Sequence, residues 1–326
     1  MEGRAGFVLR RLGKAVVVVL GVIVLNFVLI RLVPGDPASL IAGESGAADE
    51  KYLADLRRDF GLDRSIPEQL AIYVRAVAGG DLGYSHRQKE RVSKLILERI
   101  PQTLLLTGAA LLLAISLGVT LGALAAMRAG RWIDSVITVL ALVVYAAPSF
   151  WIGLMAVLLF SLQLGWLPAF GWETIGARHT GFAAVLDHAR HLVLPATTLG
   201  LFFVAVYARL TRASMLEVAQ MDFVRTARAK GIPEGQVTRR QILRNALLPI
   251  VTYAGLQAGY LVGGSILIET VFAWPGIGRL AFEAVAARDY NLLLGVFITT
   301  SVMVVAFNLL TDLAYTLVDP RIELAA

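Results

Sequence analysis

Long apolar runs separated by charged segments are the dominant pattern of this 326-residue sequence. Each run is close to the roughly 20 residues that an α-helix needs to cross a bilayer. Apolar residues gathered in such blocks, rather than spaced at the helical or strand period, are typical of helices surrounded by lipid. The pattern therefore predicts six transmembrane helices, at residues 15–32, 104–126, 136–162, 192–208, 247–268 and 292–317.

The first run follows a basic N-terminal segment, as the apolar region of a signal peptide does. A signal peptide has an apolar region of about 7 to 15 residues and then a small-residue cleavage site. Here the run continues to Leu32 and meets Pro34 and Gly35. We therefore predict a retained transmembrane helix.

The distribution of Lys and Arg indicates the orientation, because short basic segments stay on the cytoplasmic side. The N-terminal segment, the turn at 127–132 and the loop at 209–244 are all basic and fall on one face. Both termini are thus expected in the cytoplasm, with 33–100, 163–191 and 270–291 outside. The first of these outer segments also contains many basic residues, but long segments are largely exempt from the rule.

This topology predicts a chain of four parts. The long outer segment contains two amphipathic stretches, 68–77 and 90–100, joined by a glycine-rich turn. The predicted parts are a cytoplasmic N-terminus with the first helix (1–33), an extracytoplasmic helical subdomain (34–100), a core of five helices with a cytoplasmic coupling loop at 209–247 (101–318), and a cytoplasmic tail (319–326).

Composition supports a membrane protein and excludes several other classes. Hydrophobic residues make up 57% of the chain, above the roughly 45–50% of soluble proteins. The Lys and Arg residues behind the net charge of +6 lie between the apolar runs and do not form a basic stripe, which argues against nucleic-acid binding. Because cysteine is absent, no disulfide, thiolate metal site or thiol nucleophile is possible.

No catalytic or metal-binding constellation is predicted. The chain lacks a G-x-x-x-x-G-K-[ST] phosphate-binding loop, so we expect no ATP site of its own. Asp187, His188 and His191 are potential metal ligands by type, but they lack the spacing of an H-E-x-x-H site. We interpret them as interfacial residues beside a helix.

Polar residues and a proline inside the apolar runs are candidates for a translocation pathway. Polar groups are expensive in lipid, and a proline kinks a helix by removing a backbone donor. Asp312 also lies in the last run, but its place near the cytoplasmic end favours a structural role. The candidates are Asn26, Tyr145, Pro148, Ser149, Phe150 and Asn308.

Glycines at a spacing of four lie on one face of the fifth predicted helix. Small residues at this spacing allow close approach of two helices. Gly255, Gly259 and Gly263 are therefore predicted to pack against another helix, in this chain or in a partner.

The cytoplasmic loop contains a predicted short helix that ends at Gly231, before Ile232 and Pro233. Such a helix can dock into another protein, or its basic residues can lie against anionic lipid. The residues of this predicted coupling helix are Asp222, Arg225, Thr226, Ala227, Arg228, Ala229, Lys230 and Gly231.

Six motifs resemble the inner-membrane permeases of type I ATP-binding-cassette (ABC) importers, in the dipeptide/oligopeptide/nickel group. They are RLVPGDP (31–37), GDLGYS (80–85), GWLP (165–168), the segment 222–231, RNALLP (244–249) and VFAWPGIG (271–278). The wider superfamily has E-A-A where this chain has Arg225, Thr226 and Ala227, and Pro249 lies beyond the superfamily spacing. Both departures resemble the peptide/nickel branch.

The resemblance implies an all-α integral membrane protein with the type I ABC importer transmembrane fold, in the bacterial cytoplasmic (inner) membrane. It implies import of di- and oligopeptides by alternating access, with nickel complexes, glutathione or another small solute as alternatives. It also implies a second, different permease, two ATPase subunits that bind ATP and Mg²⁺, and an extracytoplasmic substrate-binding protein. A secondary transporter or a membrane enzyme remains a less favoured interpretation.

Overall fold

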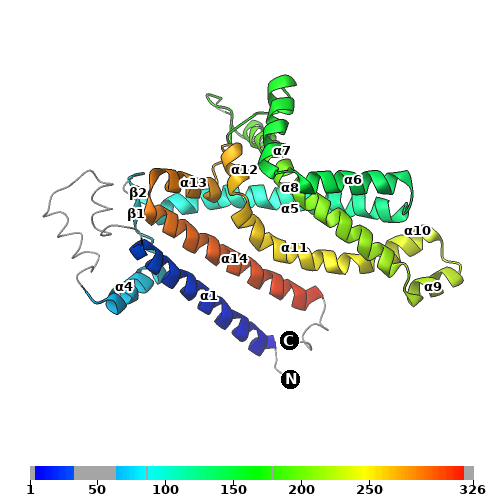
Figure 1. Ribbon diagram of the computed structural model, residues 1–326, viewed down its shortest axis with the longest axis horizontal. Coiled ribbons are helices and arrows are strands. Elements are labelled where there is room, and N and C mark those ends of the chain that lie inside the picture. Colours follow the sequence, from blue (N-terminus) through cyan, green and yellow to red (C-terminus); the bar gives the residue numbers. More distant parts are fainter. Residues whose placement is uncertain (1–3, 33–63, 86, 178, 319–326) are drawn as a thin grey trace. The chain divides into compact units, whose positions relative to one another are not determined.

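The computed structural model describes residues 4–32, 64–85, 87–177 and 179–318 (Figure 1). It is almost entirely α-helical, which confirms the predicted fold class. The chain divides into two compact units, one from residues 1–101 and 276–313 and one from residues 102–275 and 314–326. The predicted tail lies outside the described residues, and so do residues 33–63, which include the first part of the predicted outer subdomain and most of the RLVPGDP motif.

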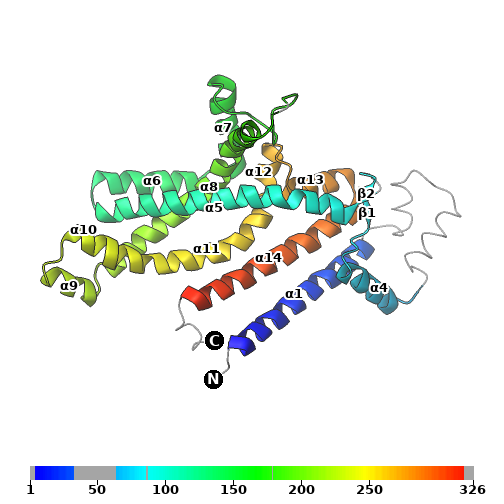
Figure 2. The same cartoon turned by 180° about the vertical axis from the view of Figure 1, so that it is seen from behind.

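Unit 1 contains α1, α4, a two-stranded ribbon, the start of α5, all of α13 and most of α14. Figures 1 and 2 show α1 and α14 side by side and antiparallel. The elements are α1 (Arg4–Leu32), α4 (Ile66–Ala78), β1 (Tyr84–Ser85), β2 (Glu90–Arg91), α5 (Val92–Met127), α13 (Ile277–Ala287) and α14 (Tyr290–Val318).

The turn between α13 and α14 is tied to the ribbon through Asp289, which is buried. One carboxylate oxygen caps α14 by accepting a hydrogen bond from the Leu292 N–H at 3.0 Å, and the other accepts one from the Ser85 hydroxyl. Arg288 ends α13 in the left-handed conformation, with a φ of 58°. The core beneath this turn contains Val92, Ile96, Ile277, Leu280, Ala281, Ala284, Leu292 and Val296.

Unit 2 contains the remaining helices. Both views show α9 and α10 at the opposite end of this unit from α7 and α12 (Figures 1 and 2). Its elements after α5 are α6 (Trp132–Ala146), α7 (Ser149–Ala156), the π-helix η1 (Val157–Gln163), α8 (Phe182–Val218), α9 (Asp222–Ala229), α10 (Glu234–Gln236), the π-helix η2 (Val237–Leu243), α11 (Arg244–Gly264) and α12 (Ile266–Val271).

Within the described residues, four helices are long and apolar enough to cross a membrane, and they lie in α1, α5, α8 and α14. The pair α6 and α7–η1 is a fifth if it counts as one broken span. The predicted fifth span, 247–268, covers most of the 21-residue α11 and continues through Ser265 into the start of α12; the side chains of 260–264 lie outside the described part. The chain is therefore an integral membrane protein with several spanning helices.

Predicted helix ends differ from the observed ones: α1 already begins at Arg4 rather than at residue 15, and three larger differences concern α5, α8 and the third span. The predicted outer stretch 90–100 is mostly the beginning of α5, which continues through Pro101. The predicted fourth helix, 192–208, is the middle of the 37-residue α8, so the first ten residues of the predicted loop 209–247 are helical. At Pro148 the chain bends by 103° between α6 and α7, which is a break rather than a kink. Ala147 is extended there (φ −77°, ψ 137°), as steric contact with a following proline favours.

In unit 2, α5 and α8 approach each other closely at two glycines of α5. A Cβ atom on Gly118 would stand 2.5 Å from the Cβ of Tyr207, and one on Gly122 would stand 2.6 Å from the Cβ of Thr211. These glycines, also four residues apart, make the kind of contact that we predicted for Gly255, Gly259 and Gly263. The structure places those three on α11, with Gly259 buried.

Candidate functional site

The predicted coupling helix forms as α9, at one end of unit 2. Val224 and Ala227, three residues apart, share one face and are both buried. They pack into a cluster with Met215 and Val218 from α8 and with Val237 from η2. This apolar face holds the helix to the unit and leaves its other face in solvent.

The end of α9 is fixed by Gly231. The Gly231 N–H donates to the Arg228 carbonyl at 2.9 Å, and the Ile232 N–H donates to the Ala227 carbonyl at 3.3 Å. This pair of bonds is the Schellman arrangement, which requires a left-handed residue, and Gly231 has a φ of 75°. The half-buried Ile232 packs against the same cluster as Val224, so the helix is anchored at its end as well as on its face.

Seven of the eight predicted coupling residues are exposed, and Ala227 is the exception. Ala227 faces the interior, so it anchors α9 and is not available for contact with a partner. The sequence interpretation missed two exposed apolar side chains, Met221 and Phe223, which are 42% and 41% exposed. Helical spacing did not mark them, because Met221 lies three residues before Val224 and Phe223 four residues before Ala227, spacings that predict the buried face.

An ion pair fixes the charged side of the same segment. Arg228 donates to both carboxylate oxygens of Glu234, at 3.1 Å and 2.7 Å. The hydrogen bonds from Arg228 lower the pKa of the Glu234 carboxyl. Arg225 lies 3.5 Å from Asp222, and both side chains are largely exposed. Arg225 and Lys230 thus give α9 a basic outer surface.

A second ion pair, which the sequence did not indicate, ties α6 to α8 near α9. Arg212 donates to the two oxygens of Asp134 at 2.6 Å and 2.8 Å, and the Gly130 N–H donates to one of them at 2.9 Å. The Asp134 side chain is only 6% exposed. Since α9 packs on the end of α8, this pair joins the helix that carries α9 to α6.

The pathway candidates Tyr145, Pro148, Ser149 and Phe150 cluster at the break between α6 and α7. Tyr145, Pro148 and Phe150 are exposed, while Ser149 is half-buried. The ring of Tyr145 stacks on Phe202 of α8, with centroids 5.0 Å apart and an interplanar angle of 21°.

The remaining two pathway candidates lie in unit 1. Asn26 is buried, and its side chain donates to the Leu294 carbonyl of α14 at 3.4 Å. Asn308 is exposed on α14. The side chain of Asp312 lies outside the described part.

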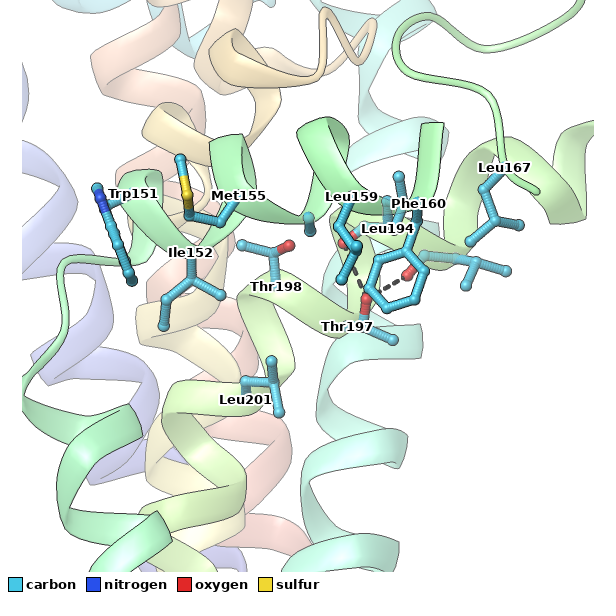
Figure 3. A pocket seen from close by; sticks show the side chains of 12 residues that line it. Trp151, Ile152, Met155, Leu159, Phe160, Leu167, Leu194, Thr197, Thr198 and Leu201 are labelled. Atoms are coloured by element: carbon cyan, nitrogen blue, oxygen red, sulfur yellow. Dashed lines mark hydrogen bonds between the residues drawn. The ribbon is translucent and has the colours of Figure 1, made fainter. Parts of the chain in front are cut away.

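An open, apolar groove of about 460 Å³ lies between α7–η1 and α8 (Figure 3). Trp151, Met155, Leu159 and Phe160 line it from one side, and residues from Val193 to Leu201 line it from the other. The hydroxyl of Thr197 is already bonded to the carbonyls of Val193 and Leu194, at 2.7 Å and 3.0 Å. The groove offers no charged group to hold a polar substrate.

The potential metal ligands have local partners. His188 stacks on Trp172, with centroids 4.2 Å apart, and its Nε2 lies 3.6 Å from Glu173. His191 Nδ1 lies 2.9 Å from the Asp187 carbonyl oxygen. Across the described ranges, no group of three His, Asp or Glu side chains is arranged to hold a metal ion.

Two family models match the chain. Residues 118–324 match the binding-protein-dependent transport system inner membrane component, and residues 5–107 match its N-terminal region. The chain belongs to this family. The first match covers α9 and every element of the site except the unit 1 candidate Asn26.

Curated relatives are similar along nearly the whole chain. A dipeptide transport system permease DppB of Alkalihalophilus pseudofirmus is 38% identical over 97% of this chain and 99% of its own length. A di/tripeptide transport system permease DppB of Pseudomonas aeruginosa is 40% identical over 97% and 98%. The DppB of Escherichia coli K12, also a dipeptide permease, is 38% identical over the same shares.

A solved structure supports the fold. A crystal structure of an amino acid ABC transporter with histidines has a TM-score of 0.51 and 18% identity, covering 68% of this chain and 93% of that one. This likeness supports the predicted ABC importer transmembrane fold for the corresponding part of the chain.

Proposed function

We propose that this chain is the permease subunit of an ATP-driven peptide importer of a bacterial inner membrane. The observation that carries this proposal is the similarity of almost the entire chain to di- and tripeptide permeases. Nickel complexes and glutathione are not favoured by these relatives.

The exposed face of α9 supports a role in coupling. A short helix that presents basic and aromatic side chains fits a groove on a partner. We propose that α9 docks on one of two ATPase subunits, which bind ATP and Mg²⁺, and that their closure moves α8 through the packing of Met215 and Val218 against Val224. A different second permease and an extracytoplasmic binding protein complete the proposed machine.

The test is uptake by the complete complex in vesicles. Radiolabelled alanyl-alanine is expected to enter saturably, only when Mg-ATP and the peptide-loaded binding protein are both present. The purified chain alone is expected to show no ATP hydrolysis. Uptake driven by a proton gradient without ATP, or uptake of nickel or glutathione but no peptide, would refute the proposal.

A further inference from the structure

A guanidinium group lies among the helices of unit 2 away from any acidic partner. Arg209 of α8 has its Cζ 4.5 Å from the centroid of the Tyr145 ring, a cation–π contact. One turn later, Arg212 is paired with Asp134. In the part of the chain that the structure describes, Arg209 forms no such ion pair.

The direction of the Arg209 side chain is informative. Helices α6 and α8 pair in antiparallel fashion, since Asp134 meets Arg212 at one end and Tyr145 meets Phe202 farther along. Side chains lean toward the N-terminus of their own helix. Arg209 and Tyr145 therefore lean toward each other, and the guanidinium extends away from the α9 end of α8. A basic side chain that extends to the nearest membrane–water interface would here lean toward the α9 end of α8, which is the opposite direction.

The surroundings of Arg209 fit a polar ligand better than lipid. Arg209 and Tyr145 are both exposed on the single chain, with Tyr145 at 42%. Arg209 is the first residue of the predicted cytoplasmic loop, but its guanidinium reaches the ring of Tyr145, thirteen residues after the start of α6 and within the predicted third span. A charge on a lipid-facing surface inside the membrane is expensive, so charged side chains there face water-filled cavities or protein. Tyr145 lies three residues before Pro148, so this surface adjoins the break between α6 and α7.

We propose that Arg209, held by Tyr145, binds the carboxylate of the peptide as it passes through the membrane, an assignment that rests on the proposed function. A guanidinium pairs with a carboxylate through two parallel N–H donors, and the aromatic ring leaves those donors free. Every linear peptide ends in a carboxylate, so one such site serves peptides of many sequences. The binding must be weak enough to release the peptide, as in any conduction pathway.

The experiment compares variants in the complete complex with saturating binding protein. The substrates are alanyl-alanine and its C-terminal amide, and each variant is scored against wild type with the same substrate, so that preferences of the binding protein cancel. Arg209→Gln is expected to lower alanyl-alanine uptake at least tenfold and amide uptake less than threefold. Arg209→Lys should lose less, and Tyr145→Leu should show a smaller loss with the same preference. Arg239→Gln removes an exposed charge from η2, and its uptake relative to wild type should be the same for both substrates.

Several outcomes would overturn the assignment. Equal loss of both substrates in Arg209→Gln, or failure of both Arg209 variants to assemble, would make Arg209 a structural or interface residue. An Arg209→Gln defect that disappears in vesicles without anionic lipid would assign the group to a lipid phosphate. If wild type does not transport the amide, alanyl-alanine uptake is compared between Arg209→Lys, Arg209→Gln and Arg209→Glu, and the loss should grow in that order as the charge facing the carboxylate is kept, removed and reversed. Wild type that imports no peptide at all would instead refute the proposed function.

Discussion

Gly231 and the Asp134–Arg212 ion pair show which single-residue features can be predicted from the sequence and which cannot. The glycine that ends α9 was predictable, because Gly-Ile-Pro after a short helical segment is a local signal, and Gly231 does adopt a left-handed φ of 75°. The pairing of Asp134 with Arg212 was not, because the two residues are 78 positions apart and nothing local marks either. Local backbone preferences can be read from a sequence, whereas partners across a fold depend on packing.

Gly231→Val is expected to uncouple transport. No atom lies within 4 Å of the added Cβ, so the damage is conformational: a β-branched residue in the left-handed region costs roughly 1–2 kcal/mol. That strain should distort the end of α9 and lower both peptide uptake and substrate-stimulated ATPase in the assembled complex.

Two matched variants make this measurement specific. Gly231→Asn should retain most activity, since asparagine tolerates the left-handed conformation. Gly235→Val, in α10, also has open space around the added side chain but no positive φ, and should transport normally. Wild-type transport by an assembled Gly231→Val complex would mean that the geometry of this helix end is unimportant for coupling.

At the level of elements, hydropathy located the helices but not their ends. Helix α8 continues to Val218 because Arg212 forms an ion pair with Asp134 and because Met215 packs beneath α9. Neither contact can be predicted from the apolar run in the sequence. Prolines were equally ambiguous: α5, α8 and α11 each contain one and continue, while the chain breaks at Pro148. Whether the surrounding helices accommodate a missing donor is decided by tertiary structure.

The contact between α5 and α8 gives an element-scale prediction. Gly118→Ala places a methyl group in a space already occupied by Tyr207, and overpacking of this kind costs about 1–3 kcal/mol. The purified chain in detergent should melt at a lower temperature. Gly108→Ala, on the same helix with nothing within 4 Å, should be neutral or slightly stabilising because alanine favours helix. Equal melting temperatures for the two variants would show that the helices separate easily at Gly118.

At the scale of the whole molecule, orientation is the main prediction still to be tested. Because the chain contains no cysteine, single cysteines report it cleanly. Ile175→Cys and Gln88→Cys, both at exposed positions in predicted outer segments, should react with an impermeant reagent in intact cells. Gln236→Cys in α10 should react only after the membrane is opened. Ser85 would be a poor probe, since it is buried against Asp289. The reverse labelling pattern would invert the topology.

The length of α8 has a mechanical consequence. A helix of 37 residues is about 55 Å long, and its close contacts with α5 run from Gly200 to Thr211, which leaves about 27 Å toward Phe182 and about 10 Å toward α9. A rod that turns about such a pivot moves its long arm more than its short arm. A displacement of about 1 Å imposed at the α9 end would therefore become about 2 Å at Phe182. If α9 docks on an ATPase subunit as proposed, a small displacement at that end of α8 would become a larger displacement at the Phe182 end.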